Sequence, residues 1–285
     1  DACFIAEVSS NHQQDLGRCL RFIDVAAEIG CDAVKFQLFR VAELFSPEAL
    51  AFKPSLHDRV KWELPESFVT AIAERCLERG IAFMCTPFYL EAVDVLAPHI
   101  AAFKVASYEL MWDELLDRCA RSGRPMMVST GMATLEEIDH AVTVIRNAGC
   151  RDLTLLHCTS AYPTPLQDAN LAAIGTLRKR YGCTVGWSDH TVVPAVVERA
   201  VLRWQATAVE FHLDLDGEGE EYATGHCWLP HEIGAVIDRL RLGRSADGNG
   251  AKVPVPSELL DREWRADPSD GMRPLVHVRR TLRPA

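Results

Sequence analysis

The chain has 285 residues, of which 48% are hydrophobic and 25% are charged, as in ordinary globular proteins. Its net charge of -10 arises from 30 basic and 40 acidic residues, which argues against nucleic acid as the main partner. No apolar run approaches the roughly 20 residues that cross a bilayer, and the first residues do not resemble a signal peptide. We therefore expect a cytoplasmic protein that binds neither nucleic acid nor membrane.

The ten cysteines are scattered along the chain, without a CxxC pair and mostly within apolar segments. In such positions cysteine acts as a small hydrophobic residue. We interpret them as reduced thiols, which agrees with a cytoplasmic location.

Eight short apolar runs alternate with segments of helical period from the N-terminus onward. The runs are apolar on both faces, as expected of strands buried in a parallel sheet. The predicted strands are residues 3–8, 33–37, 82–85, 102–106, 126–129, 153–157, 184–187 and 208–212.

The segments between the strands carry helix boundary signals. Thr134, followed by Glu137, predicts a capping box at the start of a helix. Glycines that precede a strand by a few residues predict helix C-termini. These glycines are Gly30, Gly80, Gly123, Gly149 and Gly182.

Eight strand–helix units predict an α/β fold, a (β/α)8 TIM barrel, over residues 1–242. The alternative is a doubly wound open sheet, but no G-x-G-x-x-G follows the first strand. The long connection 38–65 is typical of a lid or an oligomer contact. Residues 243–285 are rich in Pro, Gly and charge, and predict an extended tail that packs on the barrel or on a partner subunit.

Polar residues end the predicted strands, whereas the middles of the strands are apolar. In a barrel of this kind, the carboxyl ends of the strands and the loops after them build the active site. A single such lysine, histidine or hydroxyl is commonly structural. Eight polar ends together favour an active site, because burying unpaired charges is costly. These residues are Glu7, Lys35, Gln37, Thr86, Lys104, Ser107, Glu109, Ser129, Ser160, Tyr162, Ser188, Asp189, His190, Glu210 and His212.

Two kinds of chemistry are combined at this predicted rim. Lys35 and Lys104, with nearby hydroxyl groups, form a predicted cradle for phosphate and carboxylate. His190 and His212 follow the last two strands, and we expect them to lie side by side and to hold a divalent metal. Two protein ligands leave open positions for water and substrate, and imidazole with oxygen ligands suits Mn, Co, Zn or Mg.

At these residues the sequence resembles the N-acetylneuraminate (sialic acid) synthase family, from residue 3 to about 240. The resemblance implies an enzyme that condenses phosphoenolpyruvate with the open-chain aldehyde of an N-acetylated hexosamine. The products are a 2-keto-3-deoxy sugar acid and phosphate. The motifs that carry the resemblance are Ile5-Ala6-Glu7-Val8 with Asn11-His12, Lys35-Phe36-Gln37, Thr86-Pro87-Phe88, Lys104-Val105-Ala106-Ser107, Ser129-Thr130-Gly131-Met132, residues 157–165, Ser188-Asp189-His190-Thr191 and Glu210-Phe211-His212.

The resemblance also implies a role for each matching residue. His190 and His212 hold the metal, usually Mn²⁺ with Mg²⁺ or Co²⁺ as alternatives, and Glu7 and Glu109 are the acid–base candidates. A homodimer is expected. The phosphoenolpyruvate ligands implied are Thr86, Lys104, Ser107, Ser129 and Ser188, with Lys35 nearby, and the sugar-side residues are Gln37, Ser160 and Tyr162.

Three departures from the family pattern concern the sugar side. The family's C-terminal antifreeze-like domain, which supplies an arginine to the sugar, is not expected here, and Glu210-Phe211-His212 stands where Glu-Lys-His is usual. The sugar-binding Gly-Pro-Asp has no clean match. Candidates for these roles are Arg262, Arg265 and Arg273 in the tail, and Asp214, Asp216, Glu220, Glu221 and His226 after the last strand.

Three other functions stay open at the level of sequence. Lys104 or Lys35 could form a Schiff base in an aldolase or lyase on the same barrel. Phosphoenolpyruvate could be condensed with a different, non-sialic aldehyde. A third alternative is a barrel without enzymatic activity that binds a sugar or a partner through the acidic loop at 214–222.

Overall fold

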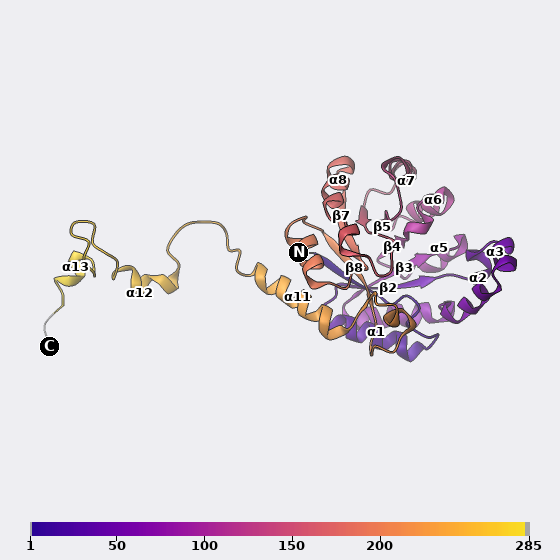
Figure 1. Ribbon diagram of the computed structural model, residues 1–285, viewed down its shortest axis with the longest axis horizontal. Helices are drawn as coiled ribbons and strands as arrows, with labels where there is room; N and C mark the ends of the chain where they lie inside the picture. The colour runs from indigo at the N-terminus through magenta and orange to yellow at the C-terminus, as the bar shows by residue number, and fades with distance from the viewer. Residues whose placement is uncertain (1, 283–285) are drawn as a thin grey trace. The chain divides into compact units, whose positions relative to one another are not determined.

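The computed structural model describes residues 2–282 and contains the predicted barrel. Eight parallel strands follow one another in chain order, and β1 pairs with β8 to close the sheet (Figure 1). The open-sheet alternative is therefore wrong. The strands are β1 (Cys3–Glu7), β2 (Ala33–Leu38), β3 (Ala82–Pro87), β4 (Ala102–Val105), β5 (Met126–Ser129), β6 (Leu153–His157), β7 (Thr184–Asp189) and β8 (Ala208–Leu213), and a short β9 (Cys227–Trp228) pairs with β8.

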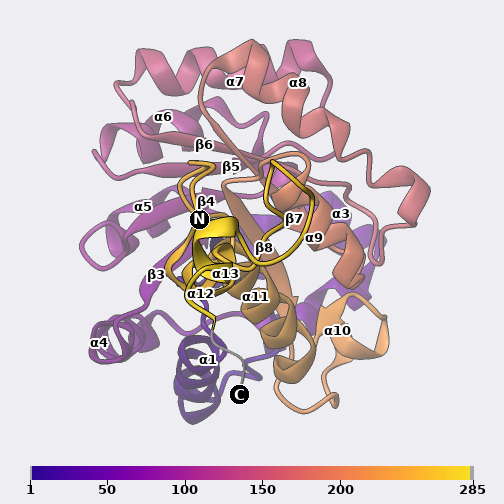
Figure 2. The same cartoon turned by 90° about the vertical axis from the view of Figure 1, so that its left-hand side faces the viewer.

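Helices surround the strands, as the ribbon views show (Figures 1 and 2). Thr134 and Glu137 form the predicted capping box, and all five predicted C-terminal glycines have positive φ angles. The helices of the first unit are α1 (Leu16–Glu28), α2 (Val41–Leu44), α3 (Pro47–Phe52), α4 (Val69–Arg79), α5 (Leu90–Leu96), α6 (Asp113–Arg121), α7 (Leu135–Asn147), α8 (Ala172–Tyr181), α9 (Pro194–Leu202), α10 (Glu220–Ala223) and α11 (Pro230–Arg244), which runs into the second unit. Short 3₁₀ helices lie at Pro54–Trp62, Glu66–Phe68, Ser107–Glu109 and Leu166–Asp168.

The chain divides into two compact units, Asp1–Arg241 and Leu242–Ala285. The second unit contains a 3₁₀ helix at Pro256–Glu258 and the helices α12 (Leu259–Arg262) and α13 (Val276–Arg279). Its turn at residues 267–272 is held by Asp267, which accepts hydrogen bonds from the Ser269 and Val276 amides. Packing of this tail on the barrel or on a partner stays a prediction.

The barrel interior changes from apolar to polar along each strand. Ile5, Ala33, Met84, Leu156 and Ala208 form a small apolar layer inside the barrel. Side chains two residues apart on a strand point to the same face. Glu7, Lys35, Thr86 and Glu210 each lie two residues beyond a member of this layer, so they also point inward, at the carboxyl end.

Close packing inside the barrel requires a glycine on β7. A Cβ atom on Gly186 would lie 2.5 Å from the Ala208 carbonyl oxygen and 2.7 Å from a methyl carbon of Leu156. No other residue fits there without moving a neighbouring strand. Gly186 thus lets β7 approach β8, and this approach brings Ser188 level with Glu210.

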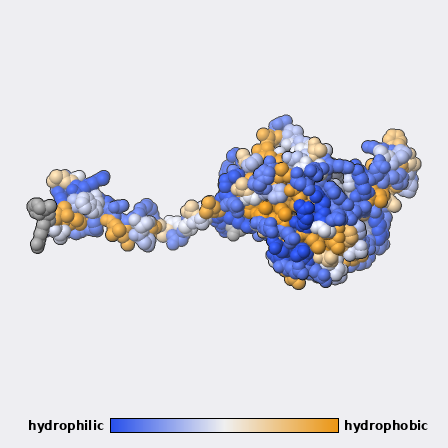
Figure 3. All heavy atoms as spheres, turned by 90° about the horizontal axis from the view of Figure 1, so that it is seen from below, coloured by the Kyte–Doolittle hydropathy of each residue, from blue (hydrophilic) through white to orange (hydrophobic). Residues whose placement is uncertain are grey.

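The large core lies between the strands and the helices, and it includes Phe36, Phe103, Trp187 and Phe211. Polar residues cover much of the barrel face that Figure 3 displays, with apolar residues between them. Among residues 2–282, no helix is both long and apolar enough to cross a membrane.

The long connection after β2 is built from the short helices α2 and α3 and the 3₁₀ helix at Pro54–Trp62. Gln14, which follows β1, donates hydrogen bonds to the carbonyl oxygens of Val60 (2.8 Å) and Glu63 (3.0 Å). The connection is therefore anchored beside the mouth of the barrel. Its role as a lid or an oligomer contact stays a prediction.

Candidate active site

Four buried charged residues form a network at the carboxyl end of the barrel. Lys35 forms an ion pair with Glu7, and its Nζ lies 3.9 Å from Glu210 Oε2. Lys104 Nζ lies 3.1 Å from the other oxygen of Glu210. All four side chains are at most 5% exposed. Because buried charges are tolerated only when they are paired, two cations balanced by two anions can persist here.

The charges of the network shift the pKa values of Glu210 and Lys35. Burial raises the pKa of Glu210, but Lys104 and Lys35 outweigh burial and lower this pKa to about 2. Burial lowers the pKa of Lys35, yet the Glu7 and Glu210 carboxylates outweigh burial and raise it. These directions describe an ionised Glu210 carboxylate beside a charged Lys35 ammonium group at neutral pH.

Several predicted substrate ligands are attached to this network. Lys35 Nζ donates to Thr86 Oγ1 (3.3 Å), and Ser188 Oγ donates to Glu210 Oε1 (2.9 Å). Gln37 Nε2 donates to Glu7 Oε1 (2.8 Å). Strand register explains the contact of Ser188 with Glu210, because these two residues pair across β7 and β8.

A second group of predicted ligands meets at the turn after β5. The Gly131 amide donates to Ser107 Oγ (3.0 Å), which is also hydrogen-bonded to Cys158 Sγ (3.3 Å). A Cβ atom on Gly131 would lie 2.3 Å from Ser160 Oγ, so glycine is required at this close approach. Ser160 Oγ is buried and has no hydrogen-bond partner among the described residues, which leaves it open to a ligand. Ser129 is buried at the last position of β5.

The two predicted acid–base carboxylates differ in their surroundings. Glu7 is held by its ion pair with Lys35 and by hydrogen bonds from Gln37 and from the Ser9 amide (3.0 Å). Glu109 lies on the 3₁₀ helix after β4, and its buried Oε2 has no hydrogen-bond partner within residues 2–282. Burial raises the pKa of Glu109 to about 7, with Lys104 opposing the shift. A carboxyl group with this pKa can exchange protons near neutral pH.

The imidazoles of His190 and His212 lie side by side, with ring centroids 5.5 Å apart. The ring of Tyr162 packs against His190 with a centroid distance of 4.2 Å. His190 Nδ1 is hydrogen-bonded to the Thr159 carbonyl oxygen (2.9 Å), and His212 Nδ1 to Glu221 Oε2 (2.8 Å). In both rings Nδ1 is hydrogen-bonded to an oxygen atom, and Nε2 remains available to a metal ion. This arrangement is common in histidines that bind metals. These residues fit a divalent metal.

Burial and neighbouring charges act differently on the two histidines. Burial, assisted by His212, lowers the pKa of His190 to about 3, so this ring is neutral. Burial also lowers the pKa of His212, but hydrogen bonds with Cys227 and Glu221 outweigh it and raise the pKa to about 10. A proton is therefore held between His212 and Glu221 when no metal is bound.

Asp189, between Ser188 and His190, is a structural residue of the turn. Its carboxylate accepts hydrogen bonds from the indoles of Trp187 (3.1 Å) and Trp228 (2.9 Å), and from the hydroxyl group of Thr191 (2.7 Å). It also accepts from the amide of Val192, which has a φ of 55° that is rare for a β-branched residue. Asp189 thus fixes the turn that presents His190, and its oxygens are occupied.

The structure gives two further residues a place in the site: Glu210, which the sequence places at the rim without a role, and Glu221, which the sequence offers only as a sugar-side candidate. Glu210 is the shared partner of both lysines, and Glu221 is the partner of His212. The signal for Glu210 was its position two residues before His212 on the same strand. Glu221 lies on the four-residue helix α10, which is too short for periodicity to predict which way a side chain points.

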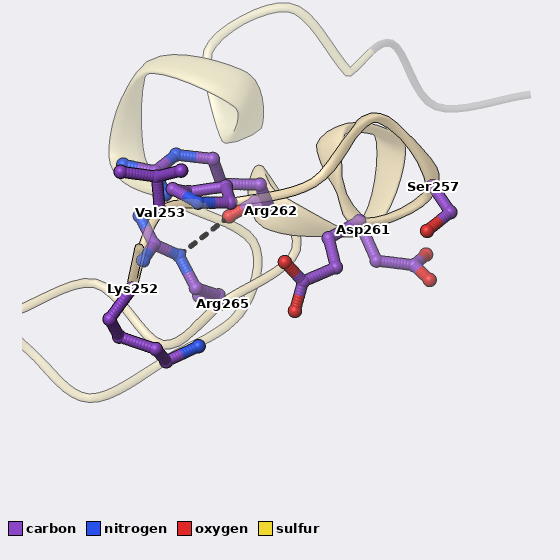
Figure 4. Close-up of a pocket in the computed structure, with 8 residues that line it drawn as sticks. Lys252, Val253, Ser257, Asp261, Arg262 and Arg265 are labelled. Carbon is purple, nitrogen blue, oxygen red and sulfur yellow. Dashed lines mark hydrogen bonds between the residues drawn. The ribbon is translucent and has the colours of Figure 1, made fainter. Parts of the chain in front are cut away.

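The other sugar-side candidates have partners of their own. Asp214 and Asp216 form ion pairs with Arg18 (3.2 and 2.8 Å), and Glu220 with Lys61 (2.6 Å). In the second unit, Arg262 and Arg265 line a pocket with Lys252, Val253, Pro254, Ser257, Glu258 and Asp261 (Figure 4).

Comparison with known proteins identifies the family. A sequence model of the NeuB family matches residues 22–252. An uncharacterized protein of Methanocaldococcus jannaschii is 37% identical, over 89% of this chain and 74% of that protein. The N,N'-diacetyllegionaminic acid synthase of Campylobacter jejuni is 32% identical, over 89% of this chain and 80% of that synthase.

A solved structure supports the same assignment. The crystal structure of N-acetylneuraminic acid (sialic acid) synthetase from Leptospira borgpetersenii, in complex with citrate, superimposes with a TM-score of 0.80 at 30% identity. The match covers 94% of this chain and 93% of that one. The resemblance seen in the sequence motifs is therefore confirmed. The chain belongs to the NeuB family and is a synthase, an enzyme of the transferase type.

Proposed function

We propose that this enzyme condenses phosphoenolpyruvate with the open-chain aldehyde of an N-acetylmannosamine-like sugar. The products are a 2-keto-3-deoxy sugar acid and phosphate. The observation that carries the proposal is the buried network of Lys35, Lys104, Glu7 and Glu210 beside the paired imidazoles. The synthase names of the relatives support the reaction class.

The cationic part of the site suits the phosphoenolpyruvate anion. Lys104 and Lys35 provide fixed positive charge in a buried place, where it attracts phosphate and carboxylate more strongly than in water. We assign four hydroxyl groups at the carboxyl ends of the strands to the oxygens of the same anion. They belong to Thr86, Ser107, Ser129 and Ser188.

The sugar aldehyde is assigned to the side of the histidines. When bound by His190 and His212, a divalent ion, proposed to be Mn²⁺ with Mg²⁺ or Co²⁺ as alternatives, supplies Lewis acidity that polarises a carbonyl group. Tyr162 covers both imidazoles and forms an apolar wall for the sugar. Gln37 and the open hydroxyl group of Ser160 complete the proposed sugar contacts.

Glu109 is the proposed proton acceptor. Attack of C3 of phosphoenolpyruvate on the aldehyde leaves positive character at C2, which water must quench with loss of a proton. The buried Glu109 carboxylate has a free oxygen and a pKa of about 7, so it can take this proton. Glu7, which forms an ion pair with Lys35, is the second candidate. Collapse of the C2 adduct then expels phosphate.

We further propose a cytoplasmic homodimer. All ten cysteines are free thiols, which supports a reducing compartment. The homodimer follows from the family resemblance.

The Schiff-base alternative is disfavoured by the lysines themselves. A lysine nucleophile requires a lowered pKa. The two carboxylates around Lys35 raise its pKa, and Lys104 is engaged by Glu210. A covalent adduct with pyruvate, trapped by borohydride, would overturn this argument.

The proposal is tested by phosphate release from phosphoenolpyruvate with Mn²⁺ and a panel of aldoses, N-acetylated amino sugars and their 6-phosphates. We expect phosphate release that depends on both the metal and one class of N-acetylated sugar. Release of phosphate with another aldehyde would support the condensation reaction but show that the acceptor is a different aldehyde. No release with any aldehyde would overturn the proposal in favour of a binding protein.

A further inference from the structure

Four potential metal ligands converge beside the mouth, on the side of His212 that faces the loop after β8. His212, Glu221, His226 and Cys227 each offer one ligand atom, and these atoms all lie within 4.8 Å of one another. Strand pairing contributes to the arrangement, because His212 of β8 is in register with Cys227 of β9. The two histidines and the cysteine are buried, and Glu221 is partly buried. His190 is not a member of this group.

The spacing of the ligand atoms suits a tetrahedral ion. Glu221 Oε2 lies 2.8 Å from His212 Nδ1, 3.5 Å from His226 Nε2 and 3.9 Å from Cys227 Sγ. In a tetrahedral zinc site, bonds of about 2.0–2.3 Å place neighbouring ligand atoms roughly 3.3–3.7 Å apart. These three contacts lie close to that spacing, and the widest pair of ligand atoms, at up to 4.8 Å, would have to close by about 1 Å around an ion.

Three of the four ligands are oriented by a further partner. Glu221 Oε1 accepts hydrogen bonds from the Ser10 amide (3.1 Å) and hydroxyl group (2.5 Å), which leaves Oε2 for the cluster. His226 Nδ1 is hydrogen-bonded to Thr224 Oγ1 (2.7 Å), which leaves Nε2. Cys227 Sγ accepts from Asn11 Nδ2 (3.7 Å). Hydrogen bonds that orient the ligands in this way are typical of metal sites, whereas an ion pair alone does not need them.

We propose that His212, Glu221, His226 and Cys227 form a second metal position, separate from the one proposed at His190 and His212. Four protein ligands close a tetrahedral shell, so this position is structural and has no opening for substrate. A thiolate with two imidazoles favours Zn²⁺ over the oxygen-seeking Mg²⁺ and Mn²⁺. This proposal does not rest on the proposed function.

His212 would serve the two positions through different nitrogens. Its Nδ1 faces Glu221, so an ion in the cluster takes the place of the proton that these two groups share. Its Nε2 is left for the position shared with His190. When both positions are filled, the ring bridges them as an imidazolate. The cluster ion would also tie the loop after β8 to Ser10 and Asn11, which follow β1.

Cobalt(II) titration of the metal-free full chain tests the proposal. We expect one equivalent of cobalt to give the near-ultraviolet thiolate-to-cobalt absorption and the intense visible bands of a tetrahedral site. Cys227→Ser should abolish the thiolate absorption. The matched control Cys183→Ser, which alters a half-exposed cysteine outside the cluster, should retain it. His190→Ala should also retain it, because His190 belongs only to the other position.

Absence of thiolate absorption in the unaltered chain would overturn the proposal, and so would its persistence in Cys227→Ser. If Cys227→Ser does not fold, X-ray absorption spectroscopy of the zinc-loaded unaltered chain identifies the atoms bound to the metal. A sulfur neighbour at about 2.3 Å supports the site, and a shell of nitrogen and oxygen alone contradicts it. Phosphate release is not read in these experiments, so failure of the condensation and failure of this metal position are distinguishable.

Discussion

The strand ends and the loop after β8 hold their functional residues in different ways. Lys35, Lys104 and Glu210 lie on strands, and hydrogen-bonded strand register sets their mutual distances. Glu221, on the short helix α10, and His226 lie on the connection between β8 and β9, where side-chain hydrogen bonds to Ser10 and Thr224 set their positions. The lysines and Glu210 are therefore held by the hydrogen bonds of the sheet, whereas Glu221 and His226 depend on a few polar side-chain contacts.

The largest effect is expected at the histidine pair. His190→Ala removes one of the two nitrogens proposed to hold the catalytic metal, so metal-dependent turnover should be abolished. Manganese binding to the full chain, measured by electron paramagnetic resonance, should be lost at the same time. Full activity with normal manganese binding would show that His190 does not hold the metal. His140→Ala, at an exposed histidine on α7, is the control that should change neither quantity.

The next largest effect is expected in the charge network. Lys104→Met leaves Glu210 with the hydrogen bond from Ser188 and the longer ion pair with Lys35, so turnover should fall by about 10²–10³-fold, as for loss of a preorganised charge. The free energy of unfolding should fall by about 3 kcal/mol, because a buried partner is removed.

The double variant Lys104→Met/Glu210→Gln separates these two effects. It removes the unbalanced carboxylate together with the lysine, so most of the lost stability should return while activity stays low. Urea unfolding and phosphate release measure the two quantities. Recovery of activity along with stability would mean that Lys104 only supports the fold.

A smaller effect is expected at Glu109. Glu109→Gln should lower kcat by about 10²-fold with little change in the KM for phosphoenolpyruvate, because only a proton transfer is lost. In the unaltered enzyme the base must be ionised, so kcat should rise with pH through about 7, the pKa to which burial raises Glu109. The variant should lack this rise. If the same pH profile persists in the variant, another group is the base, with Glu7 the first candidate.

The smallest effect is expected away from the mouth. Thr134→Ala removes the side-chain cap of α7, and the free energy of unfolding should fall by about 1 kcal/mol. Phosphate release at a temperature well below unfolding should not change. A large loss of activity would show that α7 contributes to the site through more than its packing.

Sequence periodicity predicted the barrel and much of its polar rim. Strand side chains alternate with a period of two, so an apolar residue such as Ile5 predicts that Glu7 faces the same interior. Periodicity could not predict which polar residues pair. The sequence places Asp189 among the polar strand ends of the active site, yet its carboxylate is occupied by the indoles of Trp187 and Trp228 and the hydroxyl group of Thr191. Glu221 was one of several acids in a loop, and only its tertiary contact with His212 distinguishes it.

The most direct measurement is phosphate release by the purified full chain, with phosphoenolpyruvate, Mn²⁺ and N-acetylated aldoses, followed together with formation of a 2-keto acid. Our account predicts that both products appear in equal amounts, only when metal and aldehyde are present. Release of phosphate without the keto sugar acid, or no release with any aldehyde, would contradict it.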